Sequence, residues 1–339
     1  MIPHTATPLQ TTPVQTISWQ DELARAISDP RKLFALLELD TATLASVLPA
    51  HKDFKLKVPH PYLKKIRRGD INDPLLRQVL PIGNELAEMP GYHTDPLAES
   101  MANPMPGLIH KYHGRVLLVV SPACAIHCRY CFRRHFPYQN NNPGRQQWQR
   151  PLDYIAMNPS INEVIFSGGD PLAANDQHLR WLTEQIASIA HVKRLRVHTR
   201  LPVVIPSRIT ADCVKWLTET RLQSIVVLHI NHPNELGNDV QEAVARLKSA
   251  GIDVLNQTVL LNGVNARADT LISLSEKLYE TGILPYYLHV LDAVQGAEHF
   301  AVKDEKVKEL QQQMLARLPG YLVPRIVIEK PGAASKLPV

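Results

Sequence analysis

The sequence predicts an α/β fold, a partial (β/α)6 barrel of the TIM type with an N-terminal helical extension. From about residue 116 onward, short β-branched and apolar runs alternate with longer segments whose apolar residues recur at helical spacing. These strand–helix units repeat about every 30 residues, as the βαβ units of a parallel sheet do. Six such units are too few for a closed eight-stranded barrel.

The predicted elements follow in order along the chain. The strands are 116–121, 163–167, 194–199, 224–230, 253–261 and 284–292. The helices between them are 178–190, 210–220, 239–250, 269–281 and 303–318. Thr210 and Asp239 are suited to cap helix N-termini, and Gly251 and Gly282 to end helices. A doubly wound sheet shows the same alternation and stays open as the alternative.

The first third of the chain has a different texture, rich in proline and turn residues. Asp29-Pro30 predicts a helix start, with Asp as the cap and Pro as the first helical residue. We therefore predict two domains, a mainly helical extension over residues 1–110 and a barrel core over residues 111–339.

Composition limits the classes of function. The 339 residues are 45% hydrophobic and 20% charged, with a net charge of +5, as in ordinary globular proteins. No long charge block suggests a nucleic-acid partner, and no apolar run reaches the ~18 residues of a membrane span. The first 16 residues lack a basic start followed by an apolar stretch, so we expect no secretory signal and a cytoplasmic protein.

Polar residues gather at the carboxyl ends of the predicted strands, which carry the active site in barrel enzymes. They are Cys124, Ser167 to Asp170, His198, Arg200, His229, Asn231, Asn256, Gln257 and Asp292. Six strand ends with polar residues on one face are hard to explain by packing alone.

Three of the four cysteines, Cys124, Cys128 and Cys131, fall within eight residues after the first predicted strand. This spacing lets one loop direct three thiolates to an iron–sulfur cluster, and three ligands leave one iron of a 4Fe–4S cube open to an outside ligand. The alternatives are a zinc site, with His127 or His135 as fourth ligand, and three unrelated buried thiols.

The CxxxCxxC spacing resembles the hallmark of the radical S-adenosylmethionine superfamily. Its second signature, a glycine–glycine–acid turn after the next strand, matches Ser167, Gly168, Gly169 and Asp170. Glycines allow close approach of a ligand to the backbone. The resemblance implies a 4Fe–4S cluster on the three cysteines and S-adenosylmethionine bound at this turn.

More of the chain is similar to the lysine 2,3-aminomutase family, from about residue 70 to the end. The stretches that carry this resemblance are 110–116, 131–135, 166–170, 229–235, 286–292 and 331–336. The similarity is greatest to the shorter branch that supplies (R)-β-lysine for modification of elongation factor P, particularly over 73–80 and 128–138.

That resemblance implies pyridoxal phosphate as a second cofactor, attached to Lys336. It implies that Lys111, Tyr112 and Arg115 serve its phosphate, and that His229 and Gln257 contact the adenosyl group. It further implies that Arg133 pairs with the substrate carboxylate, while Asp292 and Glu329 hold the ammonium at the tip of lysine.

The expected activity is therefore a radical 1,2-amino shift that converts (S)-α-lysine to (R)-β-lysine, with a functional link to an elongation factor P lysyl ligase and a homodimer as the expected assembly. Glu329 stands where free-lysine mutases usually have Asp, which leaves efficiency on free lysine open. Competing interpretations are another radical enzyme without pyridoxal phosphate and a non-catalytic metal-binding protein. Glutamate as substrate is disfavoured because two carboxylates would repel its side chain.

Overall fold

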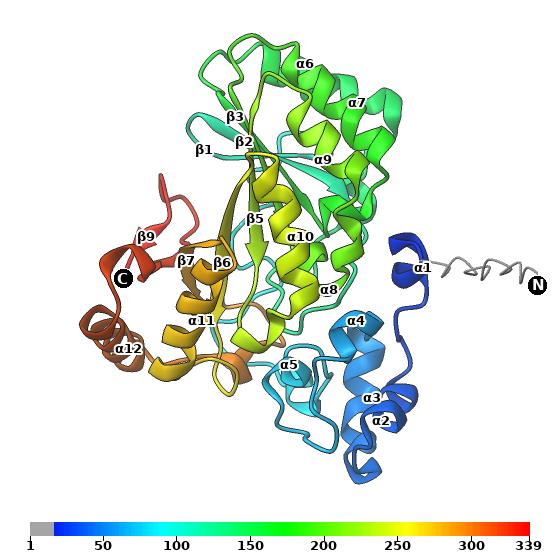
Figure 1. Ribbon diagram of the computed structural model, residues 1–339, viewed down its shortest axis with the longest axis vertical. Helices are drawn as coiled ribbons and strands as arrows, with labels where there is room; N and C mark the ends of the chain where they lie inside the picture. The colour runs from blue at the N-terminus through cyan, green and yellow to red at the C-terminus, as the bar shows by residue number, and fades with distance from the viewer. Residues whose placement is uncertain (1–16) are drawn as a thin grey trace, which may run out of the picture.

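A computed structural model describes residues 17–339. Its strands form one nine-stranded sheet in the order of the sequence, β1 to β9 (Figure 1). The central seven pair in parallel, whereas β1 and β9 pair antiparallel with β2 and β8. The bounds are β1 Leu108–Tyr112, β2 Arg115–Ser121, β3 Glu163–Gly168, β4 Arg194–Thr199, β5 Gln223–His229, β6 Asp253–Leu260, β7 Leu284–Val290, β8 Arg325–Ile328 and β9 Leu337–Pro338.

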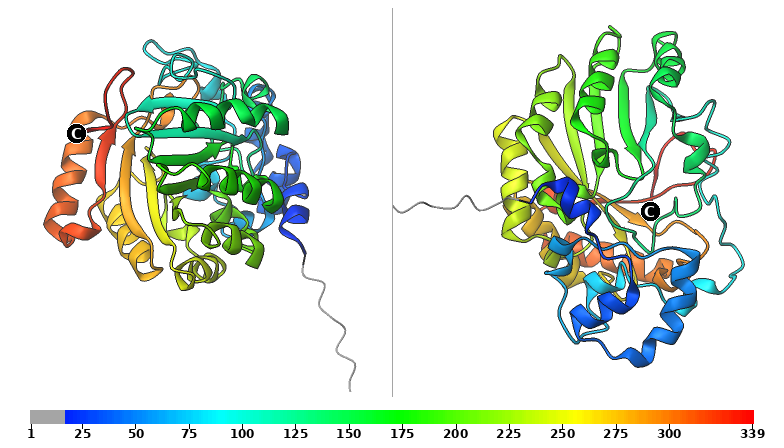
Figure 2. Two further views of the ribbon diagram at one scale, coloured as in Figure 1. Left: turned by 90° about the horizontal axis from the view of Figure 1, so that it is seen from above. Right: turned by 90° about the vertical axis from the view of Figure 1, so that its right-hand side faces the viewer.

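The sheet curves into a partial barrel with helices on its outer face, which confirms the predicted fold class (Figure 2). The helices that follow its strands are α6 Gln149–Ala156, α7 Asp176–Ala187, α8 Leu201–Val204, α9 Ala211–Thr218, α10 Asn238–Ser249, α11 Ala268–Glu280 and α12 Asp304–Arg317. The six predicted strands correspond to β2 through β7, and the five predicted helices to α7 and α9 through α12.

Several elements of the barrel region were not predicted, namely β1, α6, α8, β8 and β9. Helix α6 is only eight residues long and has Pro151 in its first turn, where proline is tolerated but obscures the helical pattern. Strand β8 has four residues, too few for a period-two pattern, and β9 has two. Strand β8 is defined by its pairing with β7 and β9, and β9 by its pairing with β8 alone.

The predicted helix ends can be compared one by one. The Asp29 carboxylate accepts from Arg31 N at the start of α2, and the Thr210 hydroxyl accepts from Cys213 N at the start of α9, as predicted. Asp239 does not cap α10, which starts at Asn238 after Gly237, so that prediction was wrong. Gly251 and Gly282 end their helices with φ of 78° and 84°, in the left-handed region that favours glycine.

The extension packs against the end of the barrel toward which the strands point (Figure 1). Its helices are α1 Trp19–Ala24, α2 Pro30–Leu37, α3 Leu44–Asp53, α4 His60–Leu63 and α5 Pro74–Arg77. One buried cluster of apolar side chains runs from Trp19 of the extension to Ile283 before β7, so the extension and the barrel share a core.

No helix in the described part of the chain is long and apolar enough to cross a membrane. Residues 1–16, on which the expectation of no secretory signal rests, lie outside the described residues.

Candidate active site

The three cysteines lie in the loop after β2, and the extension fixes this loop from outside. Lys57 Nζ donates to the carbonyl of Cys124 at 2.8 Å, and the backbone N–H of Arg129 donates to the Gln78 carbonyl at 2.9 Å. The Arg129 side chain is fully buried and forms an ion pair with Glu85. The extension therefore holds the conformation of the cysteine loop.

The three cysteines of the loop are half-buried. Burial, together with the neighbouring Cys128, raises the pKa of Cys131 to about 11. Within residues 17–339, no three Cys, His, Asp or Glu side chains converge as ligands of a single ion would. Thiolates around a 4Fe–4S cube bind different irons, so they need not converge in this way.

The glycine turn at the end of β3 lies directly against the cysteine loop. Gly169 N donates to Ser121 O and Asp170 N to Ala123 O, both at 2.8 Å. A Cβ atom on Gly169 would lie 2.6 Å from Ala123 O, so only glycine fits there. Gly168 has a φ of +123° and would bring a Cβ within 2.5 Å of Ser121 O.

Asp170 was predicted to contact the cofactor, but its carboxylate is already occupied by the chain. It accepts from Thr199 Oγ1 at 2.7 Å, from Arg200 N at 2.8 Å, and from the backbone N–H groups of Leu172 at 3.0 Å and Leu201 at 2.9 Å. These bonds fasten the end of β3 to the end of β4. In this structure Asp170 positions the turn.

Lys336 lies opposite Glu329 because β9 runs back along β8, with Leu337 paired to Ile328. The Lys336 ammonium forms an ion pair with the Glu329 carboxylate, which also pairs with Lys111 of β1. Burial alone would raise the pKa of Glu329, but the two ammonium groups outweigh it and lower the pKa to about 2. Three predicted site residues from distant segments therefore meet here.

Other predicted residues surround this ion-paired group. Burial and the charge of Glu329 raise the pKa of Asp292 to about 7. Burial and the charge of Glu329 raise the pKa of the Tyr112 hydroxyl, and the guanidinium of Arg115 lies 4.7 Å from the Tyr112 ring centre.

Arg133 connects the strand before the glycine turn with the extension. Its Nη1 donates to Ser167 Oγ at 3.1 Å, on the strand that ends in the glycine turn. Its Nε and Nη2 donate to the two carboxylate oxygens of Glu99, both at 2.7 Å. Glu99 belongs to the extension and was missed, because nothing in the local sequence marks it as the partner of an arginine 34 residues later.

His229 and Gln257 were predicted to contact the adenosyl group and are register partners on β5 and β6. The His229 ring stacks on Tyr130, and its Nε2 lies 3.1 Å from the Tyr130 hydroxyl. Tyr130 lies between two of the cysteines, so this pair is next to the cysteine loop. The side chains of these two predicted residues thus lie on the same side of the barrel as the loop.

His198 of β4 was named among the polar strand ends but was given no role, and His289 of β7 was not predicted as a site residue. His198 Nε2 is buried without a hydrogen-bond partner in the described chain. Burial and the charges of Arg196, Lys336 and Arg133 hold the pKa of His198 far below its ordinary value, so the imidazole is neutral. Burial and Lys336 lower the pKa of His289 to about 3.

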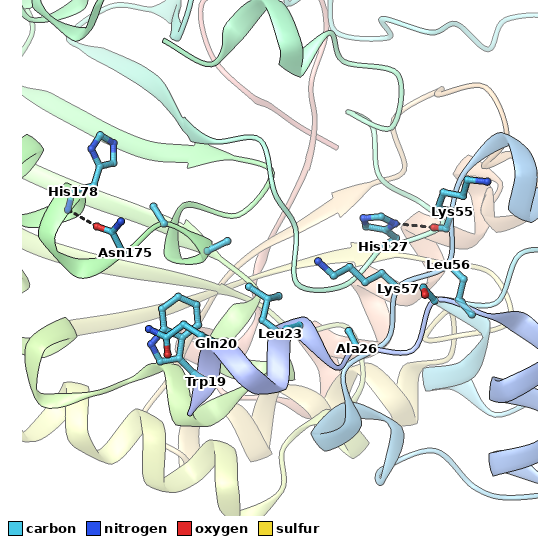
Figure 3. A pocket seen from close by; sticks show the side chains of 14 residues that line it. Trp19, Gln20, Leu23, Ala26, Lys55, Leu56, Lys57, His127, Asn175 and His178 are labelled. Atoms are coloured by element: carbon cyan, nitrogen blue, oxygen red, sulfur yellow. Dashed lines mark hydrogen bonds between the residues drawn. The ribbon is translucent and has the colours of Figure 1, made fainter. Parts of the chain in front are cut away.

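An open pocket of about 770 Å³ lies on the outer side of the cysteine loop, between α1 and the segment before α4 (Figure 3). Trp19, Lys55, Lys57 and His127 are among its lining residues, and none of the lining residues is acidic. His127 belongs to the cysteine loop, and its Nδ1 lies 2.7 Å from the Lys55 carbonyl. The pocket thus adjoins the loop but contains none of the residues around Lys336.

Proteins of similar sequence indicate the same class of site. The family model "Radical SAM superfamily" matches residues 118–274. L-lysine 2,3-aminomutase of Escherichia coli strain K12 is 47% identical over 322 residues, which cover 95% of this chain and 94% of that protein. The Haemophilus influenzae protein of the same name is 47% identical over 319 residues, covering 94% of each chain. That of Clostridium subterminale is 33% identical and covers 95% of this chain and 77% of its own.

Among solved structures, a radical SAM methyltransferase from Sphaerobacter thermophilus superposes with a TM-score of 0.45 at 16% identity, covering 65% of this chain and 68% of that one. The cysteine loop, the glycine turn and the family match define the chain as a radical S-adenosylmethionine protein, which implies a 4Fe–4S cluster and S-adenosylmethionine. The similarity to the aminomutases, which extends over nearly its whole length, is more specific. The chain belongs to the L-lysine 2,3-aminomutase family, whose members are radical isomerases.

Proposed function

We propose that this protein converts (S)-α-lysine to (R)-β-lysine by moving the amino group from C2 to C3. The observation that carries the proposal is that the cysteine loop and the ion-paired group around Lys336 lie at the same end of one barrel. Arg133 contacts Ser167 on one side, and His198 experiences the charges of both Arg133 and Lys336. The curated relatives that carry the name L-lysine 2,3-aminomutase support the same activity.

The proposal assigns the cluster to Cys124, Cys128 and Cys131, and S-adenosylmethionine to the backbone of Ser167 through Asp170 with His229 and Gln257. The glycine turn supports this assignment of S-adenosylmethionine, because the turn lies so close to the cysteine loop that a side chain there would collide with it. When bound, the cluster with S-adenosylmethionine supplies a carbon radical, and pyridoxal phosphate supplies a ring that delocalises an unpaired electron. The residues of the chain orient these groups and exclude water.

Pyridoxal phosphate is proposed to attach to Lys336, with Lys111 and Arg115 near its phosphate. The cations beside Tyr112 support this assignment, because the Arg115 guanidinium and the Lys111 ammonium are suited to bind a phosphate group. Lys336 can leave Glu329 when it binds the cofactor, since Lys111 still pairs with that carboxylate.

Lysine is proposed to bind between Arg133 and the carboxylates Asp292 and Glu329. The guanidinium has five N–H groups, of which Glu99 and Ser167 use three, so two remain for the substrate carboxylate. Asp292 is costly to ionise in the free protein, as its raised pKa shows. A substrate ammonium beside it removes that cost, whereas a side-chain carboxylate would add to it.

For the cellular role, we propose that the β-lysine serves modification of elongation factor P through a lysyl ligase, in the cytoplasm, and that the protein acts as a homodimer. The family resemblance of residues 73–80 and 128–138 supports this role. We also propose a division at residue 110, with the extension closing the mouth of the barrel core. The contacts of Lys57 and Gln78 with the cysteine loop support that closure.

Anaerobic reconstitution with iron, sulfide, S-adenosylmethionine and pyridoxal phosphate, followed by chromatography of lysine and β-lysine, tests the function. The wild-type chain should form β-lysine, and Lys336→Ala should lose both the product and the visible absorbance of the bound pyridoxal phosphate. Lys330→Ala, an exposed lysine of the same tail, is the control and should keep both.

The outcomes separate the competing classes. Cleavage of S-adenosylmethionine without β-lysine would indicate another radical reaction. A metal-loaded chain that does not cleave S-adenosylmethionine would indicate a non-catalytic metal protein. Cofactor absorbance that survives in Lys336→Ala would refute the lysine assignment alone.

A further inference from the structure

Arg200, the residue after β4, extends its guanidinium under the cysteine loop. It is buried, and its Nη1 donates to the Cys128 sulfur at 2.8 Å and to the Tyr130 hydroxyl at 2.6 Å. Its Nη2 donates to Gln78 Oε1 at 2.7 Å and Glu235 Oε2 at 2.9 Å. A charged donor therefore contacts one predicted cluster ligand from inside the protein.

The charge of Arg200 is balanced by a single carboxylate. Glu235 is fully buried, and its Oε1 accepts from the backbone N–H groups of Asn231 at 2.9 Å and His232 at 3.1 Å. Burial would lower the pKa of Arg200, but Cys128, Tyr130 and Glu235 together raise it above its ordinary value. The arginine thus stays charged, and Glu235 is the counter-charge on the side away from the sulfur.

We propose that Arg200 is a positioning residue that sets the reduction potential of the iron–sulfur cluster through Cys128, with Glu235 as its opposing partner. The inference rests on the proposed assignment of Cys128 as a cluster ligand. One-electron reduction makes a cluster more negative, so a positive donor at a sulfur ligand stabilises the reduced state and raises the potential. A buried carboxylate next to that donor partly cancels the effect.

A purely structural role makes a different prediction. Arg200 also joins the extension, β4 and the loop after β5, and loss of either member of a buried ion pair destabilises a fold. Structural damage would disturb the cluster in the same way whichever charge is removed. An electrostatic role predicts that the reduction potential falls when the charge of Arg200 is removed and rises when the charge of Glu235 is removed.

The test is a redox titration of the reconstituted cluster, without S-adenosylmethionine or lysine, in wild type, Arg200→Gln and Glu235→Gln. The potential should fall in Arg200→Gln, where Glu235 is left unbalanced, and rise in Glu235→Gln, where Arg200 is left unbalanced. We expect each equilibrium between oxidised and reduced cluster to change about tenfold, which is about 59 mV for one electron. Arg200→Lys keeps the positive charge but lacks the planar guanidinium. Its reduction potential should lie between those of wild type and Arg200→Gln.

Arg208→Gln and Asp176→Asn are matched controls, because Arg208 is equally buried and pairs with Asp176 at 2.7 Å away from the cysteines. Their potentials should equal that of wild type. Shifts of the same sign in Arg200→Gln and Glu235→Gln, or no shift in either, would overturn the proposal. If Arg200→Gln takes up no cluster, the sign of the shift in Glu235→Gln decides it. A wild-type chain that binds no cluster would instead overturn the assignment of the cysteines.

Discussion

The two parts of the candidate site lie at the same end of the barrel but are built differently. The cysteine–glycine region, residues 124–131 and 167–170, is fixed by backbone hydrogen bonds and by contacts too close for any side chain. The lysine region, formed by Lys111, Asp292, Glu329 and Lys336, is held by ion pairs and a two-residue strand. The geometry of the first region is set by the backbone, whereas that of the second depends on side-chain charges.

The largest effect on metal binding is expected at the glycine turn, because the cysteine–glycine region has no room to adjust there. Gly169→Ala places a Cβ 2.6 Å from Ala123 O and 2.7 Å from Pro122 O, both backbone atoms that cannot move aside cheaply. We expect a loss of about 1–3 kcal/mol in the free energy of unfolding, from the cost of overpacking, together with loss of bound iron after reconstitution. Urea denaturation measures the free energy of unfolding, and iron analysis measures the bound iron.

Gly320→Ala is the control for this substitution, because no atom lies within 4 Å of the added Cβ. It should leave both stability and iron content unchanged. Wild-type iron content in Gly169→Ala would show that the turn adapts, and that the two regions do not differ in rigidity.

In the lysine region, removing a charge should increase stability. Burial and Glu329 raise the pKa of Asp292 from 3.8 to about 7. Between these pH values the folded protein holds a proton that the unfolded chain has released, so stability falls as the pH rises and the loss is complete above pH 7. Asp292→Asn should therefore be more stable than wild type by about 2–4 kcal/mol at pH 8, and equally stable near pH 3.

Denaturant unfolding of the cofactor-free protein at several pH values measures this difference. Asp253→Asn, at an exposed aspartate, is the control and should show no comparable pH-dependent gain. The same Asp292→Asn chain should bind lysine more weakly, because it lacks the carboxylate for the substrate ammonium. A destabilised Asp292→Asn at pH 8 would mean that Asp292 already has a partner in the free protein.

The sequence was informative where chemistry depends on residues close together in the chain. The spacing of Cys124, Cys128 and Cys131 and the two glycines after β3 could be interpreted directly, because one loop and one turn hold them. The alternation of strands and helices likewise predicted β2 through β7. Family resemblance added Lys336 and Glu329, although it did not indicate that a short antiparallel pairing brings them together.

What was missed depends on contacts between distant segments. Glu99 meets Arg133 across 34 residues, and Arg200 meets Gln78 across 122 residues. The sequence also did not indicate that the Asp170 carboxylate accepts from donors of β4 and the helix after it. Such partners are set by how the extension and the strand ends pack, and no local pattern records that packing.

The smallest expected effect tests whether side chains add to the rigidity of the cysteine–glycine region. The Tyr138 hydroxyl donates to the Gly168 carbonyl at 2.9 Å, next to the turn whose backbone approaches Ser121 and Ala123. Because the surrounding backbone bonds remain, Tyr138→Phe should cost only the net value of one hydrogen bond, about 1 kcal/mol, and leave iron content unchanged. Tyr321→Phe, at a tyrosine that is 60% exposed, is the control and should be neutral. Loss of iron in Tyr138→Phe would mean that the glycine turn depends on this side chain, and that the cysteine–glycine region resembles the lysine region more than its backbone contacts indicate.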